Sequence, residues 1–405
     1  MYEKINIDVL NNSGIRIVDL RSDTVSKPTP EMREAMYRAP VGDDVYGEDP
    51  TVAKLERQAA ELLGMEEAVF VASGTMANLI AIMVHCNQRG SEIISGDFGH
   101  TFKFEQGGTA QIAGVHTAVI KNNEDGTFSI DDLRKKIRKN PDFHEPISSL
   151  IIVENTHNLC GGKVLPLEWM EKVHNVAQEY NLPVHMDGAR MMNAAVYLKV
   201  PPSRVVRDVD SVCFCLSKGL GCPVGAILAG TSEFIAKARR VRKAIGGGWR
   251  QAGIIAAAGL VALDKMIGRL EEDHKHAFQI AKGIAELNSV YFKVNLSEIQ
   301  SNIIIMRLDP RISPKDTQKR LAAIYPTDPI KVSVKCSARD DWIRFVTFWE
   351  VTDETATLAT QKIVHVLKEI ETDFVNNRGN ASLLKRTYAQ TLAAIQAQTK
   401  IVSKL

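Results

Sequence analysis

Between residues 67 and 230 the chain alternates short, almost continuously apolar runs with helical stretches, and this alternation constrains its fold more than any other feature. We expect strands in these apolar runs, at 67–72, 93–95, 150–154, 183–187, 211–216 and 224–229. Such strands, separated by helices, predict a mainly parallel sheet that is covered on both faces. Ligands of these sheets bind outside the carboxyl ends of the strands. The sequence therefore predicts an α/β fold with its site at that edge.

The length of 405 residues and changes in pattern along the chain indicate more than one unit. We predict an N-terminal arm at 1–48, a large domain at 49–288 and a small α+β C-terminal domain with a helical tail at 289–405. The arm has too little apolar surface to fold alone, so it must lie along the main body or a neighbouring subunit.

The predicted small domain is described by its expected elements. It has strands of a smaller sheet at 302–307, 330–335 and 343–347, helices at 314–324 and 353–372, a linker at 373–380 and an amphipathic tail at 383–405. We interpret the tail as a packing or partner helix.

Composition excludes several functional classes. The formal charge of +2, without a basic block, argues against a nucleic-acid partner. No apolar run reaches the length of a membrane span, and the N-terminus resembles neither a secretory signal nor a transit peptide. The six cysteines include no C-x-x-C pair, which is typical of reduced thiols. We therefore expect a cytoplasmic protein.

Polar residues follow several of the predicted strands and should meet at one edge. Lys218 follows the strand at 211–216 and precedes a glycine pair. In a partly dry environment its amine becomes a nucleophile that can form an imine with an aldehyde. Asp187 ends the strand at 183–187, where its carboxylate can pair with a ring nitrogen. Taken alone, Lys218 is a solvated loop residue and Asp187 is a helix cap.

A possible phosphate site precedes a predicted helix. Ser73, Gly74 and Thr75 stand between the strand at 67–72 and an apolar helical stretch, so hydroxyls and free backbone N–H groups can hold an anion. Together with a lysine and an acid at the same edge, this phosphate site meets the requirements of pyridoxal 5′-phosphate.

Six motifs resemble those of the low-specificity L-threonine aldolases. They are DLRSDT at 19–24, SGTMAN at 73–78, ENTHN at 154–158, HMDGAR at 185–190, SKGLGCPVG at 217–225 and GGGWRQ at 246–251. The resemblance covers about residues 16–260. It implies a fold-type-I pyridoxal-phosphate enzyme: an aspartate-aminotransferase-like large domain with a mainly parallel seven-stranded sheet, and a small C-terminal domain. It also implies a homotetramer, a dimer of dimers with active sites at the dimer interface.

The resemblance assigns roles around the cofactor ring. Lys218 would hold pyridoxal 5′-phosphate, and Asp187 would pair with the pyridinium nitrogen. Arg190 would donate to the ring hydroxyl and lie close to the substrate, and His100 would stack on the ring. An imidazole at that place can also move protons.

The resemblance assigns the cofactor phosphate to two groups of residues. The Gly74 and Thr75 amides and the Thr75 hydroxyl, beside Ser73, would take the phosphate. Arg250 would reach the phosphate of the partner subunit, which would make the dimer the catalytic unit.

The implied reaction cleaves L-threonine or L-allo-threonine to glycine and an aldehyde, as in glycine biosynthesis or threonine catabolism. A base must remove the proton of the β-hydroxyl. His157, His100 or a water between them is the candidate, and the sequence does not decide which.

The substrate carboxylate needs an arginine. We choose Arg344, with Ser22 assisting. The ordinary alternative for Arg344 is a surface ion pair with Asp340 or Asp341.

Other interpretations stay open. A pyridoxal enzyme of the same fold could racemise alanine or carry out a β-elimination, and a non-catalytic protein could keep the fold as a binding module. Phe348 and Trp349 stand where the family usually has a histidine. His185 either supports Asp187 or is a core histidine. We interpret the helical histidines as surface or packing residues, and we find no spacing typical of a metal site. These helical histidines are His85, His174, His274, His276 and His365.

Overall fold

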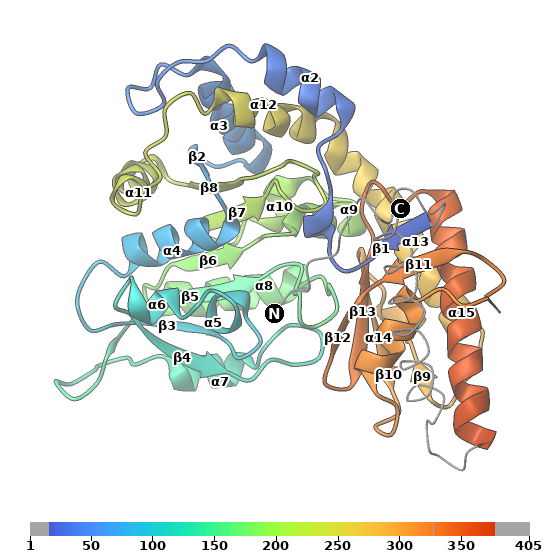
Figure 1. Ribbon diagram of the computed structural model, residues 1–405. Helices are drawn as coiled ribbons and strands as arrows, with labels where there is room; N and C mark the ends of the chain where they lie inside the picture. The colour runs from blue at the N-terminus through green and yellow to red at the C-terminus, as the bar shows by residue number, and fades with distance from the viewer. Residues whose placement is uncertain (1–15, 327, 377–405) are drawn as a thin grey trace, which may run out of the picture.

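A computed structural model of the chain describes residues 16–326 and 328–376 (Figure 1). The predicted tail at 383–405 lies outside these residues. The predicted linker at 373–380 is wrong for its first part, because helix α15 (Asp353–Asn376) continues through it. Within the described part of the chain, no helix is both long and apolar enough to cross a membrane.

A seven-stranded sheet forms the centre of the larger unit (Figure 1). In spatial order its strands are β2 (Glu67–Val71), β8 (Ala226–Gly230), β7 (Ser211–Cys215), β6 (Val184–Asp187), β5 (Ile147–Glu154), β3 (Ser91–Gly96) and β4 (His116–Ile120). The five strands from β7 to β4 are parallel, and β8 is antiparallel to both of its neighbours. The predicted mainly parallel α/β fold is confirmed. The edge strand β4 was not predicted, because its residues alternate in burial instead of forming an apolar run.

Helices connect and cover these strands. They are α2 (Pro30–Arg38), α3 (Pro50–Leu63), α4 (Gly74–His85), α5 (His100–Lys103), α6 (Gly108–Gln111), α7 (Ile130–Lys136), α8 (Leu167–Glu179), α9 (Met191–Leu198), α10 (Pro202–Val205), α11 (Ser232–Ala244), α12 (Gly253–Val261), the π-helix η2 (Ala262–Met266) and α13 (Ile267–Ala285). Helix α3 begins where Asp49 accepts hydrogen bonds from the Thr51 and Val52 amides, and it ends at Gly64 in the left-handed conformation.

The C-terminal part contains a four-stranded antiparallel sheet. Its order is β12 (Ser337–Arg339), β13 (Trp342–Val346), β10 (Ile303–Leu308) and β9 (Phe292–Lys293), and the segment η3 (Leu296–Glu298) and helices α14 (Pro314–Ala322) and α15 accompany it. The prediction that 330–335 joins this sheet is wrong. Strand β11 (Val332–Lys335) instead pairs in parallel with β1 (Arg16–Asp19).

The N-terminal arm is held by that pairing. Val18 and Leu20 are buried in a hydrophobic core that they share with the four-stranded sheet and α15, and the segment η1 (Asp23–Val25) follows. A second, larger core packs against the seven-stranded sheet. The predicted division into 1–48, 49–288 and 289–405 stays a prediction.

Candidate active site

The carboxyl ends of the central strands meet at one edge of the seven-stranded sheet. The Asn155 amide after β5 donates to the Asp187 carbonyl at the end of β6, at 3.0 Å. The Arg190 Nη1 donates to Asn158 Oδ1 at 3.4 Å. The predicted convergence of these strand-end segments is therefore found in the structure.

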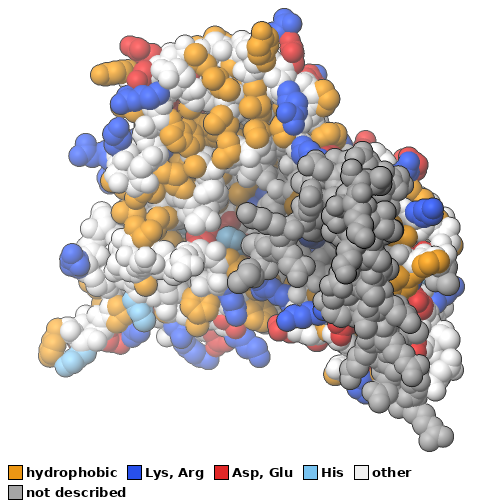
Figure 2. All heavy atoms as spheres, in the orientation of Figure 1, with side chains coloured by type: hydrophobic (Ala, Val, Ile, Leu, Met, Phe, Trp, Pro, Cys, Tyr) orange, Lys and Arg blue, Asp and Glu red, His pale blue; other side chains and the backbone are white. Residues whose placement is uncertain are grey.

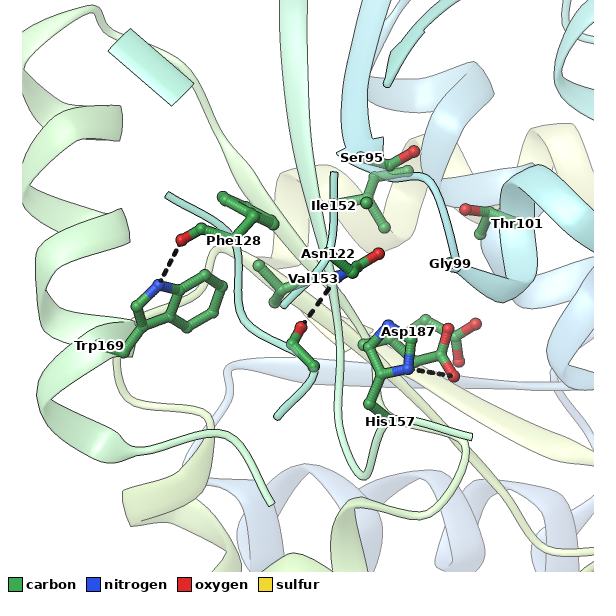
Figure 3. Close-up of a pocket in the computed structure, with 13 residues that line it drawn as sticks. Ser95, Gly99, Thr101, Asn122, Phe128, Ile152, Val153, His157, Trp169 and Asp187 are labelled. Carbon is green, nitrogen blue, oxygen red and sulfur yellow. Dashed lines mark hydrogen bonds and ion pairs between the residues drawn. The ribbon is translucent and has the colours of Figure 1, made fainter. Parts of the chain in front are cut away.

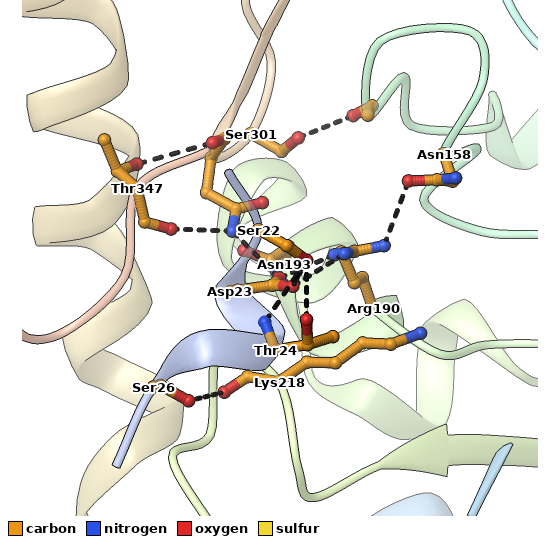
Figure 4. A network of polar contacts seen from close by, with 12 residues as sticks. Ser22, Asp23, Thr24, Ser26, Asn158, Arg190, Asn193, Lys218, Ser301 and Thr347 are labelled. Atoms are coloured by element: carbon orange, nitrogen blue, oxygen red, sulfur yellow. Dashed lines mark hydrogen bonds and ion pairs between the residues drawn. The ribbon is translucent and has the colours of Figure 1, made fainter. Parts of the chain in front are cut away.

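Lys218 lies at this edge directly after β7. The Ser26 hydroxyl of the N-terminal arm donates to the Lys218 carbonyl at 3.0 Å, which fixes the backbone of the turn. Figure 4 shows the Lys218 side chain extended beside Arg190, with its amino end away from the drawn contacts. The amine is therefore presented at the strand edge, where no carboxylate of the described residues forms an ion pair with it.

Asp187 is the last residue of β6 and is almost fully buried. Its Oδ2 accepts a hydrogen bond from Asn78 Nδ2 at 2.9 Å, and its Oδ1 accepts one from the Ala189 amide at 3.2 Å. A buried carboxylate needs such donors. Asn78 was not among the predicted site residues.

The N-terminus of α4 lies next to β7. The Ser73 hydroxyl accepts from the Met76 amide at 3.1 Å and caps the helix. A Cβ atom at Gly74 would lie 2.7 Å from Cys215 Sγ, so only glycine lets the helix start approach the strand this closely. The first N–H groups of a helix have no acceptors within it, so the Gly74 and Thr75 amides are available to an anion.

His100 lies at the start of α5 and is partly exposed. Its Nδ1 is 2.9 Å from Glu105 Oε1, and its amide donates to Glu154 at 2.7 Å. Burial lowers the pKa of His100, but the hydrogen bond to Glu105 and the charge of Asp187 outweigh it, so the pKa is raised. Burial, reinforced by the charge of Asp187, raises the pKa of Glu105. Glu105 was missed by the sequence analysis.

His157 is buried, with a side chain that is 2% exposed. Its Nδ1 is 4.0 Å from Glu154 Oε1 and lacks a hydrogen-bond partner among the described residues. Figure 3 shows His157 near Asp187, at a small cavity that both residues line. Glu154 also accepts from the Asn158 amide at 2.8 Å, so one carboxylate organises the loops of both histidines.

Arg190 is held by a carboxylate that the sequence analysis did not single out. Its Nε and Nη2 each donate to Asp23 at 2.6 Å, and Asn302 Nδ2 adds a bond to Asp23 at 3.1 Å (Figure 4). Burial raises the pKa of Asp23, but the charges of Arg190 and Lys218 outweigh it, and the pKa falls to about 2. This geometry leaves Nη1 of Arg190 to face Asn158 and the site.

Arg344 lies on β13 with no carboxylate partner among the described residues. Its Nη1 donates to Asn158 Oδ1 at 2.8 Å, its Nη2 donates to the Arg21 carbonyl at 3.4 Å, and its Nε has no partner there. Burial and the charge of Arg190 lower its pKa to about 10. The alternative of a surface pair is wrong, because Asp341 pairs with Arg307 instead. A partly buried cation without a counter-ion among the described residues is suited to bind an anion.

Two predicted residues have other contacts. Ser22 caps η1 by accepting from the Thr24 amide, next to Asp23, so it belongs to the edge of the site (Figure 4). Arg250 is about half exposed and pairs with Asp43 at 2.9 Å, in the loop before α3. Its described contacts are with that loop and not with the edge that carries Lys218.

The sheet, its strand order and the lysine and aspartate at its carboxyl edge define the class of protein: an α/β protein with the fold of the fold-type-I pyridoxal-phosphate enzymes. A solved structure of a putative L-allo-threonine aldolase from Listeria monocytogenes matches with a TM-score of 0.70 at 21% identity, over 84% of this chain and 95% of that one.

Comparisons of sequence identify the family. The beta-eliminating lyase family model matches residues 19–309. A probable low-specificity L-threonine aldolase 2 of Arabidopsis thaliana is 47% identical over 310 residues, 76% of this chain and 87% of that protein. The low specificity L-threonine aldolase of Escherichia coli (strain K12) is 46% identical over 270 residues, 67% of this chain and 80% of that protein. The chain belongs to the beta-eliminating lyase family and is a lyase.

Proposed function

We propose that this protein uses pyridoxal 5′-phosphate to cleave L-threonine and L-allo-threonine to glycine and acetaldehyde. One observation carries the proposal: Arg344, which is partly buried and has no carboxylate partner among the described residues, donates to Asn158 at the edge that also presents Lys218 and Asp187. The names of the similar proteins favour an aldolase over alanine racemisation or β-elimination as the main activity. They also argue against a non-catalytic binding module.

The residues fit the proposed cofactor. Asp187 offers a buried carboxylate to a protonated ring nitrogen, and Lys218 offers an amine to an aldehyde. Gly74 and Thr75 offer helix N–H groups to a phosphate, in a place where a side chain at Gly74 would clash. When bound, pyridoxal phosphate supplies an electron sink for the pair left at Cα when a substrate bond breaks.

The substrate is held by its charges. Arg344 would bind the carboxylate, because Asn158 and the Arg21 carbonyl satisfy only part of its donors. Arg190, fixed by Asp23, would stand beside it as a second cation. Two guanidinium groups and one aspartate leave a net positive charge for the anionic substrate. Held at its carboxylate in this way, the substrate would keep one orientation in the site.

The β-hydroxyl proton needs an acceptor near the substrate. The His100–Glu105 pair suits this role, because a carboxylate hydrogen-bonded to one imidazole nitrogen stabilises the protonated ring. His157, supported by Glu154, remains the second candidate. As the proton leaves, the C–O bond becomes a carbonyl and the Cα–Cβ bond breaks, which releases the aldehyde. A proton returned to Cα completes glycine.

We also propose that two copies share an apolar face, as in the predicted homotetramer. Figure 2 shows hydrophobic side chains gathered over the part of the molecule where α2 and α12 lie. Tyr37 is 86% exposed and Tyr46 is 77% exposed, and Ile254 on α12 is also exposed. Patches of this kind mark protein interfaces. Arg250 borders the same region through Asp43, which supports its proposed reach into the partner's site.

The proposal is tested by reduction with borohydride. The purified protein is loaded with pyridoxal phosphate, reduced and digested, and the peptides are analysed by mass spectrometry. We expect a covalent pyridoxyl group on Lys218 in the wild-type protein and no pyridoxyl-labelled peptide in Lys218→Ala. A colourless wild-type protein, or a label spread over surface lysines, would contradict the proposal.

A further inference from the structure

A chain of hydrogen bonds runs from Asp187 away from the site. Asn78 Oδ1 is 3.1 Å from His185 Nε2, the His185 Nδ1 is 2.9 Å from Ser211 Oγ, and this hydroxyl is 2.8 Å from His85 Nε2. At the other end, Asn78 Nδ2 donates to both Asp187 and Glu105, at 2.9 and 2.8 Å. Asn78, His185 and Ser211 are almost fully buried.

The secondary structure brings these residues together. Asn78 and His85 are seven positions apart on α4 and therefore share one face of that helix. His185 and Asp187 are two positions apart on β6, so they point to the same side of the sheet. Ser211 opens β7, which pairs with β6 so that Ser211 lies opposite His185.

The direction of every bond follows from the two carboxylates. Oxygen atoms of Asp187 and Glu105 and a ring nitrogen of His100 lie within 4.8 Å of one another. An amide carbonyl facing both carboxylates would be repelled, so Asn78 must turn its NH₂ group toward them and its oxygen toward His185. Cys213 Sγ, 3.1 Å from the same oxygen, can only donate there.

Once Asn78 is oriented, the remaining hydrogen bonds between these side chains have one consistent arrangement of donors and acceptors. His185 donates from Nε2 to Asn78, so in its neutral form Nδ1 accepts the Ser211 hydroxyl proton. The Ser211 oxygen then accepts from His85 Nε2–H. Burial lowers the pKa of His185 to about 4 and that of His85 to about 3, which keeps both rings neutral near pH 7.

We infer that Asn78 is a positioning residue that ends a one-directional chain of donors, from His85 through Ser211 and His185, aimed at the Asp187 and Glu105 carboxylates. All its N–H and O–H dipoles point toward these two groups and favour negative charge beside the cofactor site. Through Glu105 the same amide links Asp187 to His100, so the ring partner and the proton acceptor are held as one unit. The expected effect on cofactor binding rests on the proposed function, whereas the direction of the hydrogen bonds does not.

The geometry is tested on the wild-type full chain without cofactor. In protein labelled with ¹⁵N-histidine, ring-nitrogen shifts report the tautomer of each histidine. We expect His85 and His185 to stay neutral Nε2–H tautomers from about pH 5.5 to 8, with exposed His144 as the internal reference. A Nδ1–H tautomer of either histidine, or titration of either ring in this pH range, would overturn the inferred direction of the hydrogen bonds.

The consequence is tested with Asn78→Leu, which keeps the size of the side chain and removes both ends of the amide. We expect the dissociation constant of pyridoxal phosphate to rise about tenfold or more, and His185 to lose its single tautomer. An unchanged dissociation constant in a folded variant, checked by circular dichroism, would overturn the positioning role. If the wild-type protein binds no pyridoxal phosphate, the proposed function fails, while the tautomers still decide the geometry.

Discussion

Replacing Arg344 by methionine should separate stability from substrate binding. The side chain is largely buried, and its pKa is lowered from 12.5 to about 10 by burial first and then by the charge of Arg190. At 1.36 kcal/mol per unit, this fall corresponds to about 3 kcal/mol of unfavourable free energy for the charged form in the folded protein. The folded state therefore carries a cost that methionine removes.

The hydrogen bonds of Arg344 offset part of this gain. They go to Asn158 Oδ1 at 2.8 Å and to the Arg21 carbonyl at 3.4 Å. At about 1 kcal/mol each they contribute about 2 kcal/mol. Arg344→Met should therefore leave the free energy of unfolding unchanged or raise it by about 1 kcal/mol. The loss of a buried charge pair with the substrate carboxylate should instead lower kcat/KM by about 10²–10³-fold.

The assay compares thermal unfolding without substrate and the kinetics of glycine release from L-allo-threonine. Arg307→Met is the matched control, because Arg307 lies on the neighbouring strand β10, is exposed and pairs with Asp341. It should change stability by less than about 0.5 kcal/mol and leave kcat/KM unchanged. A strongly destabilised Arg344→Met with normal kcat/KM would refute the reasoning, since it would make Arg344 a structural residue.

Three further predictions follow from the buried charges. Asp23→Asn leaves Arg190 without its counter-ion, so the free energy of unfolding from denaturant titration should fall by about 3–5 kcal/mol. An unchanged free energy of unfolding would show that the ion pair does not stabilise the fold. His100→Asn should lower kcat about 10²–10⁴-fold with KM little changed in steady-state kinetics, and a larger loss in His157→Asn alone would move the proton acceptor to His157. Asp273 on α13 is fully buried, and burial outweighs its ion pair with Arg269, so its pKa is raised to about 7, above its unfolded value of 3.8. The folded state therefore holds this proton more tightly. The contribution of Asp273 to the free energy of unfolding is therefore fully present below about pH 4 and is lost as pH rises through about 7, by up to about 4 kcal/mol. The melting temperature of Asp273→Asn should lack this fall with pH. An unaltered fall in the variant would contradict the assignment.

The sheet and its edge were predictable because they depend on local pattern. Apolar runs predicted the central strands, and a lysine and an aspartate at strand ends must meet when those strands are parallel and adjacent. The structure shows that β6 and β7 are neighbours in the sheet, so Asp187 and the segment of Lys218 lie at the same edge. Their roles at the cofactor came from the family resemblance and stay predictions.

The supporting residues were not predictable because they depend on packing between distant segments. Asn78 stands between apolar residues in the middle of α4, and only the crossing of α4 over β6 and β7 brings it to Asp187. That isolated polar residue was the available signal. Asp23 reaches Arg190 because the arm folds back through the pairing of β1 with β11, and this non-local pairing leaves no pattern in either segment. Glu105 lies in a loop whose position follows from α5.

Product release from the four stereoisomers of threonine tests the central claim most directly. Wild-type protein loaded with pyridoxal phosphate should release glycine and acetaldehyde in equal amounts from L-threonine and L-allo-threonine, and neither product from the D isomers. Lys218→Ala should release neither product from any isomer. An enzyme that left both L isomers intact, or that interconverted alanine enantiomers instead, would contradict the account.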